Sequence, residues 1–171
     1  DAAGLFYWGT RLNDGMSLQE IAASFFVQPE TRAAYPNPDD NAGLVNAVYR
    51  NFLGRDPDEE GFDYWVGELE NGNVQRPEFI LAIINGAKAE TGDPADAAFL
   101  AEKTKVGTYF AGIQGLNDVD QASTAMGLIT RDDIDLGEAK DTIDGFALDA
   151  SSPESGDYTL KVVGVLDDPL A

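Results

Sequence analysis

Apolar residues recur at helical spacing through most of the chain. Leu5, Trp8 and Leu12, for example, lie three and four residues apart. This spacing places side chains on one face of an α-helix, which must be buried against another element. The same pattern predicts eight helices, at about residues 2–13, 18–27, 40–53, 57–70, from 77 onward, 94–113, 118–129 and 134–148.

The ends of these segments carry the residues that begin and end helices. Ser17 and Glu20 fit a capping box, and Asp56 before Pro57 fits an acidic N-cap followed by proline at the first helical position. Gly54 suits a left-handed residue at a helix end. The acidic run that includes Asp133 and Asp135 predicts a cap for the last helix. The boundaries are therefore predicted independently of the apolar pattern.

The expected fold is all-α, an antiparallel helical repeat or bundle of about eight helices with a mostly irregular C-terminal tail. The tail is rich in Pro, Gly and Asp and contains one strand-like run at 158–165. We divide the chain into four parts: the second half of a truncated repeat (1–33), a complete repeat (34–91), helices packed on the repeats (92–150), and a linker (151–171).

The division rests on an internal repeat. Residues 1–15 match residues 58–72 at an offset of 57, with six identities, whereas average residue usage gives about one. The identical pairs are Asp1 and Asp58, Gly4 and Gly61, Tyr7 and Tyr64, Trp8 and Trp65, Leu12 and Leu69, and Gly15 and Gly72. The second copy is preceded by a helical segment that the first copy lacks. We therefore expect residues 1–171 to be a piece of a longer multi-domain protein.

Composition excludes several classes of function. The chain has 31 acidic and 11 basic residues, a net charge of −20, and neither Cys nor His. Nucleic acids and anionic membranes require basic clusters that the sequence does not show. Without Cys or His, disulfides, thiolate catalysis and the commonest zinc ligands and general bases are excluded.

Acidic clusters leave two interpretations open. Asp56, Asp58 and Glu60 before Gly61 resemble the first half of an EF-hand calcium loop, but the twelfth position is Gly67 and supplies no carboxylate. Carboxylates at helix starts are also stabilised by the helix dipole and need no metal. The same two interpretations apply to the acidic groups Asp118 and Asp120, and Asp132, Asp133 and Asp135.

Aromatic pairs are the other candidate for binding. Trp8 and Trp65 lie on the apolar faces and favour core packing, whereas Tyr7 and Tyr64 are offset and are expected to be half exposed. Exposed aromatic rings can stack on sugars. No phosphate loop, nucleophile elbow or dinucleotide-binding motif is present.

The run from Leu53 to Trp65 resembles the signature of the bacterial domain of unknown function 4214, which reads Leu-Gly-Arg, Pro-Asp, Gly, Tyr-Trp. The resemblance covers residues 1–91 and, less closely, 92–150. It implies a helical repeat from large secreted or surface bacterial proteins, often beside calcium-binding RTX repeats or in adhesins and surface layers. The family offers no catalytic or ligand-binding residues to carry over. The sequence also resembles, more weakly, phycobilisome linker domains, which share helical repeats with a Leu-Gly-Arg turn.

From these observations we expect a non-catalytic structural or adhesive module of a larger secreted or cell-surface bacterial protein. We assign no catalytic, cofactor or metal site and no nucleic-acid partner. The expected partners are other domains of the same polypeptide, and possible ligands are calcium or a surface polysaccharide. That ligand-binding module is the first alternative, and a carboxylate-based glycoside hydrolase is the second.

Overall fold

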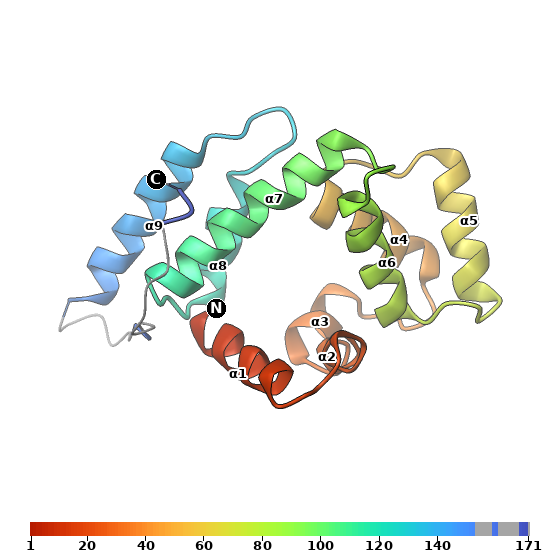
Figure 1. Ribbon diagram of the computed structural model, residues 1–171, viewed down its shortest axis with the longest axis horizontal. Helices are drawn as coiled ribbons and strands as arrows, with labels where there is room; N and C mark the ends of the chain where they lie inside the picture. The colour runs from red at the N-terminus through yellow and green to blue at the C-terminus, as the bar shows by residue number, and fades with distance from the viewer. Residues whose placement is uncertain (153–158, 161–167, 171) are drawn as a thin grey trace. The chain divides into compact units, whose positions relative to one another are not determined.

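The computed structural model describes residues 1–152, 159–160 and 168–170, and within these ranges the fold is all-α, as the sequence predicts (Figure 1). Helices of eight or more residues account for most of it. The elements are α1 Ala2–Asn13, α2 Leu18–Phe25, α3 Pro29–Ala34, α4 Asn41–Leu53, α5 Glu59–Glu70, α6 Arg76–Lys88, α7 Pro94–Thr108, the π-helix Tyr109–Ile113, α8 Val119–Gly127 and α9 Leu136–Ala150. In the described part of the chain, no helix combines the length and apolarity needed to cross a membrane.

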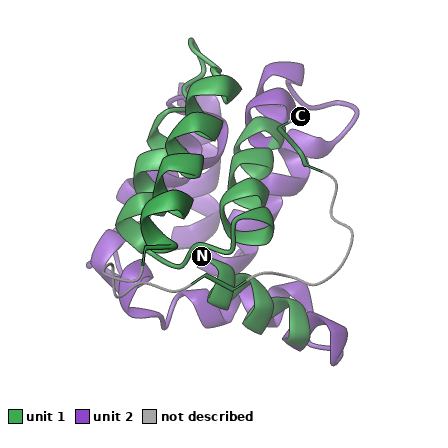
Figure 2. Cartoon of the chain, turned by 90° about the vertical axis from the view of Figure 1, so that its left-hand side faces the viewer, with its two compact units in different colours: residues 1–10, 101–171 green, residues 11–100 purple. Residues whose placement is uncertain are grey.

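The helices form two compact units, which Figure 2 distinguishes by colour. One unit contains residues 11–100, from the end of α1 to the first turns of α7. The other contains residues 1–10 and 101–171. Because α1 and α7 cross the boundary, the units differ from the four-part division proposed from the sequence.

The core of the 11–100 unit is built around α4. Leu44, Val45 and Val48 are almost completely buried, and α4 packs against both α5 and α6. Helix α2 packs on α6 in turn. The buried cluster also contains further residues of α4, α5 and α6: Tyr49, Leu53, Leu69, Phe79, Ile83 and Ala87. The cluster contains nine buried side chains. Burial of each of the larger ones stabilises the fold by roughly 1.5–3 kcal/mol. This core is therefore the main stabilising element of the unit.

The sequence repeat is also a structural repeat. Helices α1 and α5 have the same length, and their first-turn amides are capped alike: Gly4 N lies 2.6 Å from Asp1 Oδ1, and Gly61 N lies 2.7 Å from Asp58 Oδ1. Each helix is followed by a glycine with positive φ, Gly15 at 98° and Gly72 at 69°. The tyrosine and tryptophan rings are in edge contact in both copies, with centroids 4.8 and 4.9 Å apart.

Two local features correct the sequence interpretation. The N-cap of α5 is Asp58, not Asp56, because Pro57 keeps the residue before it extended and the helix begins at Glu59. Asp56 instead forms an exposed ion pair with Arg50. In addition, residues 29–34 form the short helix α3, which begins at Pro29 and lies between two of the helices predicted from the sequence.

The apolar face expected on α1 is not covered in this structure. Leu5 and Leu12 are 51% and 48% exposed, whereas Leu69, the counterpart of Leu12, is 8% exposed. Tyr7 and Tyr64 are about half exposed, as predicted, and Trp8 and Trp65 are partly buried. The strand-like run at 158–165 lies mainly outside the described residues.

In the unit of residues 1–10 and 101–171, α7 continues into the π-helix and α8 packs against α9. Its buried residues include Val106, Phe110 and Ile143. The first turn of α1 belongs here: Ala2 N lies 2.8 Å from the carbonyl oxygen of Leu116, and Ala3 N lies 2.8 Å from Asn117 Oδ1. The start of α1 is therefore fixed by backbone and side-chain acceptors as well as by Asp1.

Candidate functional site

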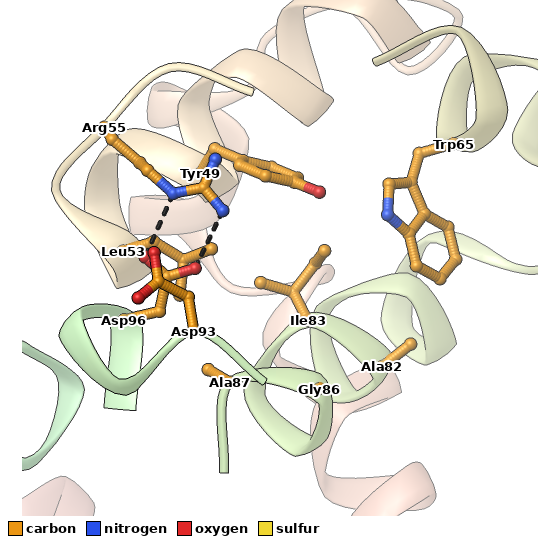
Figure 3. Close-up of a pocket in the computed structure, with 10 residues that line it drawn as sticks. All are labelled: Tyr49, Leu53, Arg55, Trp65, Ala82, Ile83, Gly86, Ala87, Asp93 and Asp96. Atoms are coloured by element: carbon orange, nitrogen blue, oxygen red, sulfur yellow. Dashed lines mark hydrogen bonds and ion pairs between the residues drawn. The ribbon is translucent and has the colours of Figure 1, made fainter. Parts of the chain in front are cut away.

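The 11–100 unit contains a pocket of about 220 Å³ between α4, α5, α6 and the start of α7 (Figure 3). In Figure 3 Arg55 and Asp96 lie at one side of it and Trp65 at the other, with the Tyr49 ring between them. Small residues of α6 complete the wall. The lining residues are Tyr49, Leu53, Arg55, Trp65, Ala82, Ile83, Gly86, Ala87, Asp93 and Asp96.

The polar side of the pocket is an ion pair between the Leu-Gly-Arg turn and α7. Arg55 Nε lies 3.0 Å from Asp96 Oδ1 and Arg55 Nη2 lies 2.8 Å from Asp96 Oδ2, so the pair is bidentate. The Asp96 side chain is 6% exposed and that of Arg55 is 30% exposed. The hydrogen bond to Asp96 raises the pKa of Arg55 above its usual value, so the guanidinium stays charged. The guanidinium also lies over the Tyr49 ring, 5.2 Å from its centroid.

Gly54, the residue before Arg55, is required for two reasons. Its φ of 67° is left-handed, a region that side chains other than glycine rarely adopt. A Cβ at this position would also lie 2.7 Å from the Phe99 ring, which is itself buried. Gly54 therefore ends α4 and leaves room for α7 to pack directly on the turn.

Tyr49 fills the space between the turn and α5. Its hydroxyl would lie 3.2 Å from a Cβ on Gly61, as would Asp58 Oδ1, so α4 approaches the first turn of α5 closely. Burial raises the pKa of Tyr49, and the Trp65 indole N–H and Arg55 act in the opposite direction. Trp65 packs on Phe79 with ring centroids 5.2 Å apart, so the motif tryptophan joins α5 to α6.

The chemistry available in this pocket is limited. A volume of about 220 Å³ is below the roughly 300–1,000 Å³ of typical small-molecule sites. Tyr49 is held protonated at neutral pH, Asp96 is bound to Arg55, and Asp93 Oδ1 accepts a hydrogen bond from the Ala95 amide at 2.9 Å. Each polar group that lines the pocket therefore has a partner within the protein.

In each acidic cluster singled out from the sequence, one carboxylate acts as a helix cap. Asp118 accepts from Gln121 N at 2.8 Å and Asp135 from Glu138 N at 2.9 Å, and Asp58 caps α5 as described above. Asp132 and Asp133 are exposed, and Asp133 N donates to the Thr130 hydroxyl. Within the described ranges, no group of three or more carboxylates is arranged to hold a metal ion.

A second polar cluster, in the other unit, was not anticipated. The buried hydroxyl of Tyr109 in the π-helix donates to Asp144 Oδ1 at 2.5 Å and accepts from Gln114 Nε2 at 3.0 Å. Lys140 Nζ donates to the same hydroxyl and lies 3.2 Å from Asp168 Oδ2. The bond to Tyr109 raises the pKa of Lys140, so its charge persists. The cluster links the π-helix to α9 and to Asp168 in the tail. Only the helical spacing of Lys140 and Asp144 is visible in the sequence.

Residues 22–91 match a family model that is described as a domain of unknown function (DUF4214). Residues 22–91 belong to the DUF4214 family. The resemblance inferred for residues 1–21 and 92–150 lies outside the matched segment. Neither the comparison with curated proteins nor that with solved structures gave a match.

The DUF4214 signature can be interpreted from this geometry. Leu53 is buried in the core, Gly54 makes room for Phe99, and Arg55 binds Asp96. Both partners in α7 lie beyond the end of the DUF4214 match at residue 91. The signature residues therefore join the DUF4214 domain to the helix that follows it.

Proposed function

We propose that this chain is a non-catalytic structural module, with an adhesive or spacing role, in a larger secreted or cell-surface bacterial protein. One observation carries the proposal: the side chains of the DUF4214 signature make contacts between helices. Arg55 binds Asp96, Trp65 packs on Phe79, and the Tyr49 hydroxyl lies against α5. A signature that served binding or catalysis would leave some of these groups directed towards a ligand.

The charge distribution supports the same proposal. Acidic side chains lie at helix starts, where they accept hydrogen bonds from backbone N–H groups of the first turn. These residues are Asp40, Asp58, Asp118 and Asp135. Capping of this kind stabilises a helix by about 1 kcal/mol per cap without any ligand. A net charge of −20 also keeps an exported repeat protein soluble. The secreted or surface location is proposed from the context of related domains, such as RTX-type, adhesin and surface-layer proteins.

The alternative is a module that binds calcium or a surface polysaccharide. Its support is the exposure of Tyr7 and Tyr64, 51% and 57%, beside the two tryptophans. Such rings can stack on sugars, since their faces are apolar and their hydroxyls reach water. The structural proposal needs no binding at these positions.

A binding experiment distinguishes the structural module from the ligand-binding module. The purified chain is passed over immobilised bacterial surface polysaccharide beside the double variant Tyr7→Ser and Tyr64→Ser. The control is Leu148→Ser, which removes an apolar side chain that is 75% exposed. The structural proposal predicts no saturable retention of any of the three proteins. Saturable retention that the tyrosine changes abolish and the control preserves would establish the alternative.

A further inference from the structure

Asparagine is followed by glycine at two places in the chain, Asn71–Gly72 and Asn85–Gly86. At such a pair the backbone nitrogen can attack the asparagine side chain, because glycine has no side chain to shield its own nitrogen. Both asparagines are exposed, so water reaches either of them. The structure, however, places the two pairs in different backbone environments, and both lie within the 11–100 unit.

The first pair lies where α5 ends. Asn71 is the C-cap of α5, and Gly72 follows it with a left-handed φ of 69°. The Gly72 nitrogen lies 3.3 Å from the carbonyl oxygen of Leu69, which is a long hydrogen bond for a backbone amide. Residues 70–73 are all exposed. Rotation of the backbone at this point therefore breaks one weak hydrogen bond and little packing.

The second pair lies in the last turn of α6, Arg76–Lys88, but this turn is packed. An amide at the position of Gly86 donates to the carbonyl oxygen four residues earlier in the helix. On either side of the pair, Ile83 and Ala87 are 5% and 6% exposed and belong to the buried cluster. Release of the Gly86 nitrogen from the helix therefore requires the core to open.

The reaction of the first pair needs water alone. The Gly72 nitrogen loses its proton to hydroxide and attacks Cγ of Asn71, which closes a cyclic imide. The bond from Cγ to the side-chain nitrogen breaks, and this nitrogen takes a proton from water and leaves as ammonia. Water then opens the imide at one of its two carbonyls, giving aspartate or isoaspartate. Asn71 has a ψ of −7°, which turns the Gly72 nitrogen away from Cγ, so closure requires rotation at the end of α5.

The first copy of the repeat already carries the aspartate product. At the offset of 57, Asn71 corresponds to Asp14, and Gly72 corresponds to Gly15, which also has a positive φ. Asp14 is exposed. A carboxylate before the left-handed glycine is therefore compatible with this turn, whereas isoaspartate lengthens the backbone by one carbon and is not.

We propose that Asn71 is a site of spontaneous deamidation through a cyclic imide formed with Gly72, and that α6 protects Asn85 from the same reaction. The product places a negative charge at the C-terminal end of α5, where the helix dipole disfavours it. The turn of the second repeat thereby acquires the charge that the first repeat has at the same position. The inference does not depend on the proposed structural role, because the reaction involves no ligand or partner.

Incubation of the intact folded chain at neutral and at mildly alkaline pH tests the proposal. Mass spectrometry with fragmentation assigns each change from amide to acid to a single residue. Asn71 should react about tenfold faster than Asn85 or more, because opening of the packed turn limits the reaction at Asn85. The rate at Asn71 should rise with pH, because the attacking nitrogen must lose its proton. Asn73 is a control in the same turn, since the β-branched Val74 follows it and hinders attack.

The same incubation in denaturant shows whether the fold causes the difference. The two pairs have identical reacting groups, so their rates should converge once α6 is unfolded. Asn71→Gln is the matched variant, because its longer side chain closes a larger ring slowly. This variant should lose the modification at position 71 and keep the rate at Asn85 unchanged.

Three results would overturn the inference. Equal rates at Asn71 and Asn85 in the folded chain, or a faster rate at Asn85, would show that the packed turn of α6 gives no protection. A difference that persists in denaturant would show that neighbouring residues and not the fold decide the rate. Aspartate without any isoaspartate at position 71 would show direct hydrolysis of the side chain in place of the cyclic imide.

Discussion

Arg55 and Asp96, which are 41 residues apart in the chain, form a bidentate ion pair that joins the turn after α4 to the first turns of α7. The pair is partly shielded from water, since the Asp96 side chain is 6% exposed. Removal of one partner leaves the other charge poorly solvated, which costs more than the pair itself contributes. The pair therefore makes the position of the first turns of α7, residues 94–100, specific within the 11–100 unit.

The first prediction concerns this pair. Arg55→Ala should lower the free energy of unfolding by about 2–4 kcal/mol, because it leaves Asp96 buried and uncompensated. Arg50→Ala is the matched control: Arg50 and Asp56 are also paired, but both side chains are about two-thirds exposed. That change should cost less than about 1 kcal/mol. Urea denaturation of both variants checks the difference, and equal losses would contradict a structural role specific to Arg55.

The second prediction separates backbone strain from packing at the signature glycine. Gly54 and Gly72 have similar positive φ values, 67° and 69°, but a Cβ would meet Phe99 at Gly54 and nothing within 4 Å at Gly72. Gly72→Ala should cost about 1–2 kcal/mol from the left-handed backbone alone. Gly54→Ala should cost at least about 1 kcal/mol more, because the ring must move.

Rescue provides the test of that second prediction. Phe99→Leu in the Gly54→Ala background should recover part of the additional loss, whereas it should recover none in the Gly72→Ala background. A double-mutant cycle measured by chemical denaturation gives this coupling. Identical losses at the two glycines, with no coupling to Phe99, would show that the close contact carries no energy.

The third prediction compares the two tryptophans. Trp65→Ala should cost about 3 kcal/mol or more, because Trp65 packs on the completely buried Phe79 and on the α4 core. Trp8→Ala should cost clearly less, since the helix that carries Trp8 also exposes Leu5 and Leu12. Thermal and urea unfolding of the two variants check the order. A loss at Trp8 as large as that at Trp65 would show that α1 is packed as completely as α5.

Local signals in the sequence were sufficient for most of the fold. Apolar spacing located eight of the helices, and Ser17 with Glu20 forms the predicted capping box, in which the Ser17 backbone amide donates to Glu20 at 2.8 Å. The repeat was equally readable, because both copies conserve the glycine and aromatic positions. Helix α3 was missed because Pro29–Ala34 is too short to show an apolar period.

The contacts that define the candidate site depended on tertiary structure. Asp96 was one of many acidic residues, and nothing in its local sequence distinguishes the carboxylate that binds Arg55 from those that cap helices. The individual hydrogen bonds of the Tyr109 cluster join side chains up to 35 residues apart, and Tyr109 itself lies in an unexpected π-helix. The exposure of Leu12 was also hidden, because spacing identifies an apolar face but not whether a neighbour covers it.

The central claim is that the module folds and holds its shape without a bound ligand, and a thermal melt in chelator, magnesium and calcium at equal ionic strength tests it most directly. We predict the same melting temperature in calcium as in magnesium, because Asp58, Asp118 and Asp135, one from each group that suggested a calcium site, act as helix caps. A calcium site occupied at a hundredfold excess over its Kd would add about 2.7 kcal/mol, which is roughly 5–10 °C for a chain of this size. A calcium-specific rise of that magnitude would contradict the structural account and establish a binding module in its place.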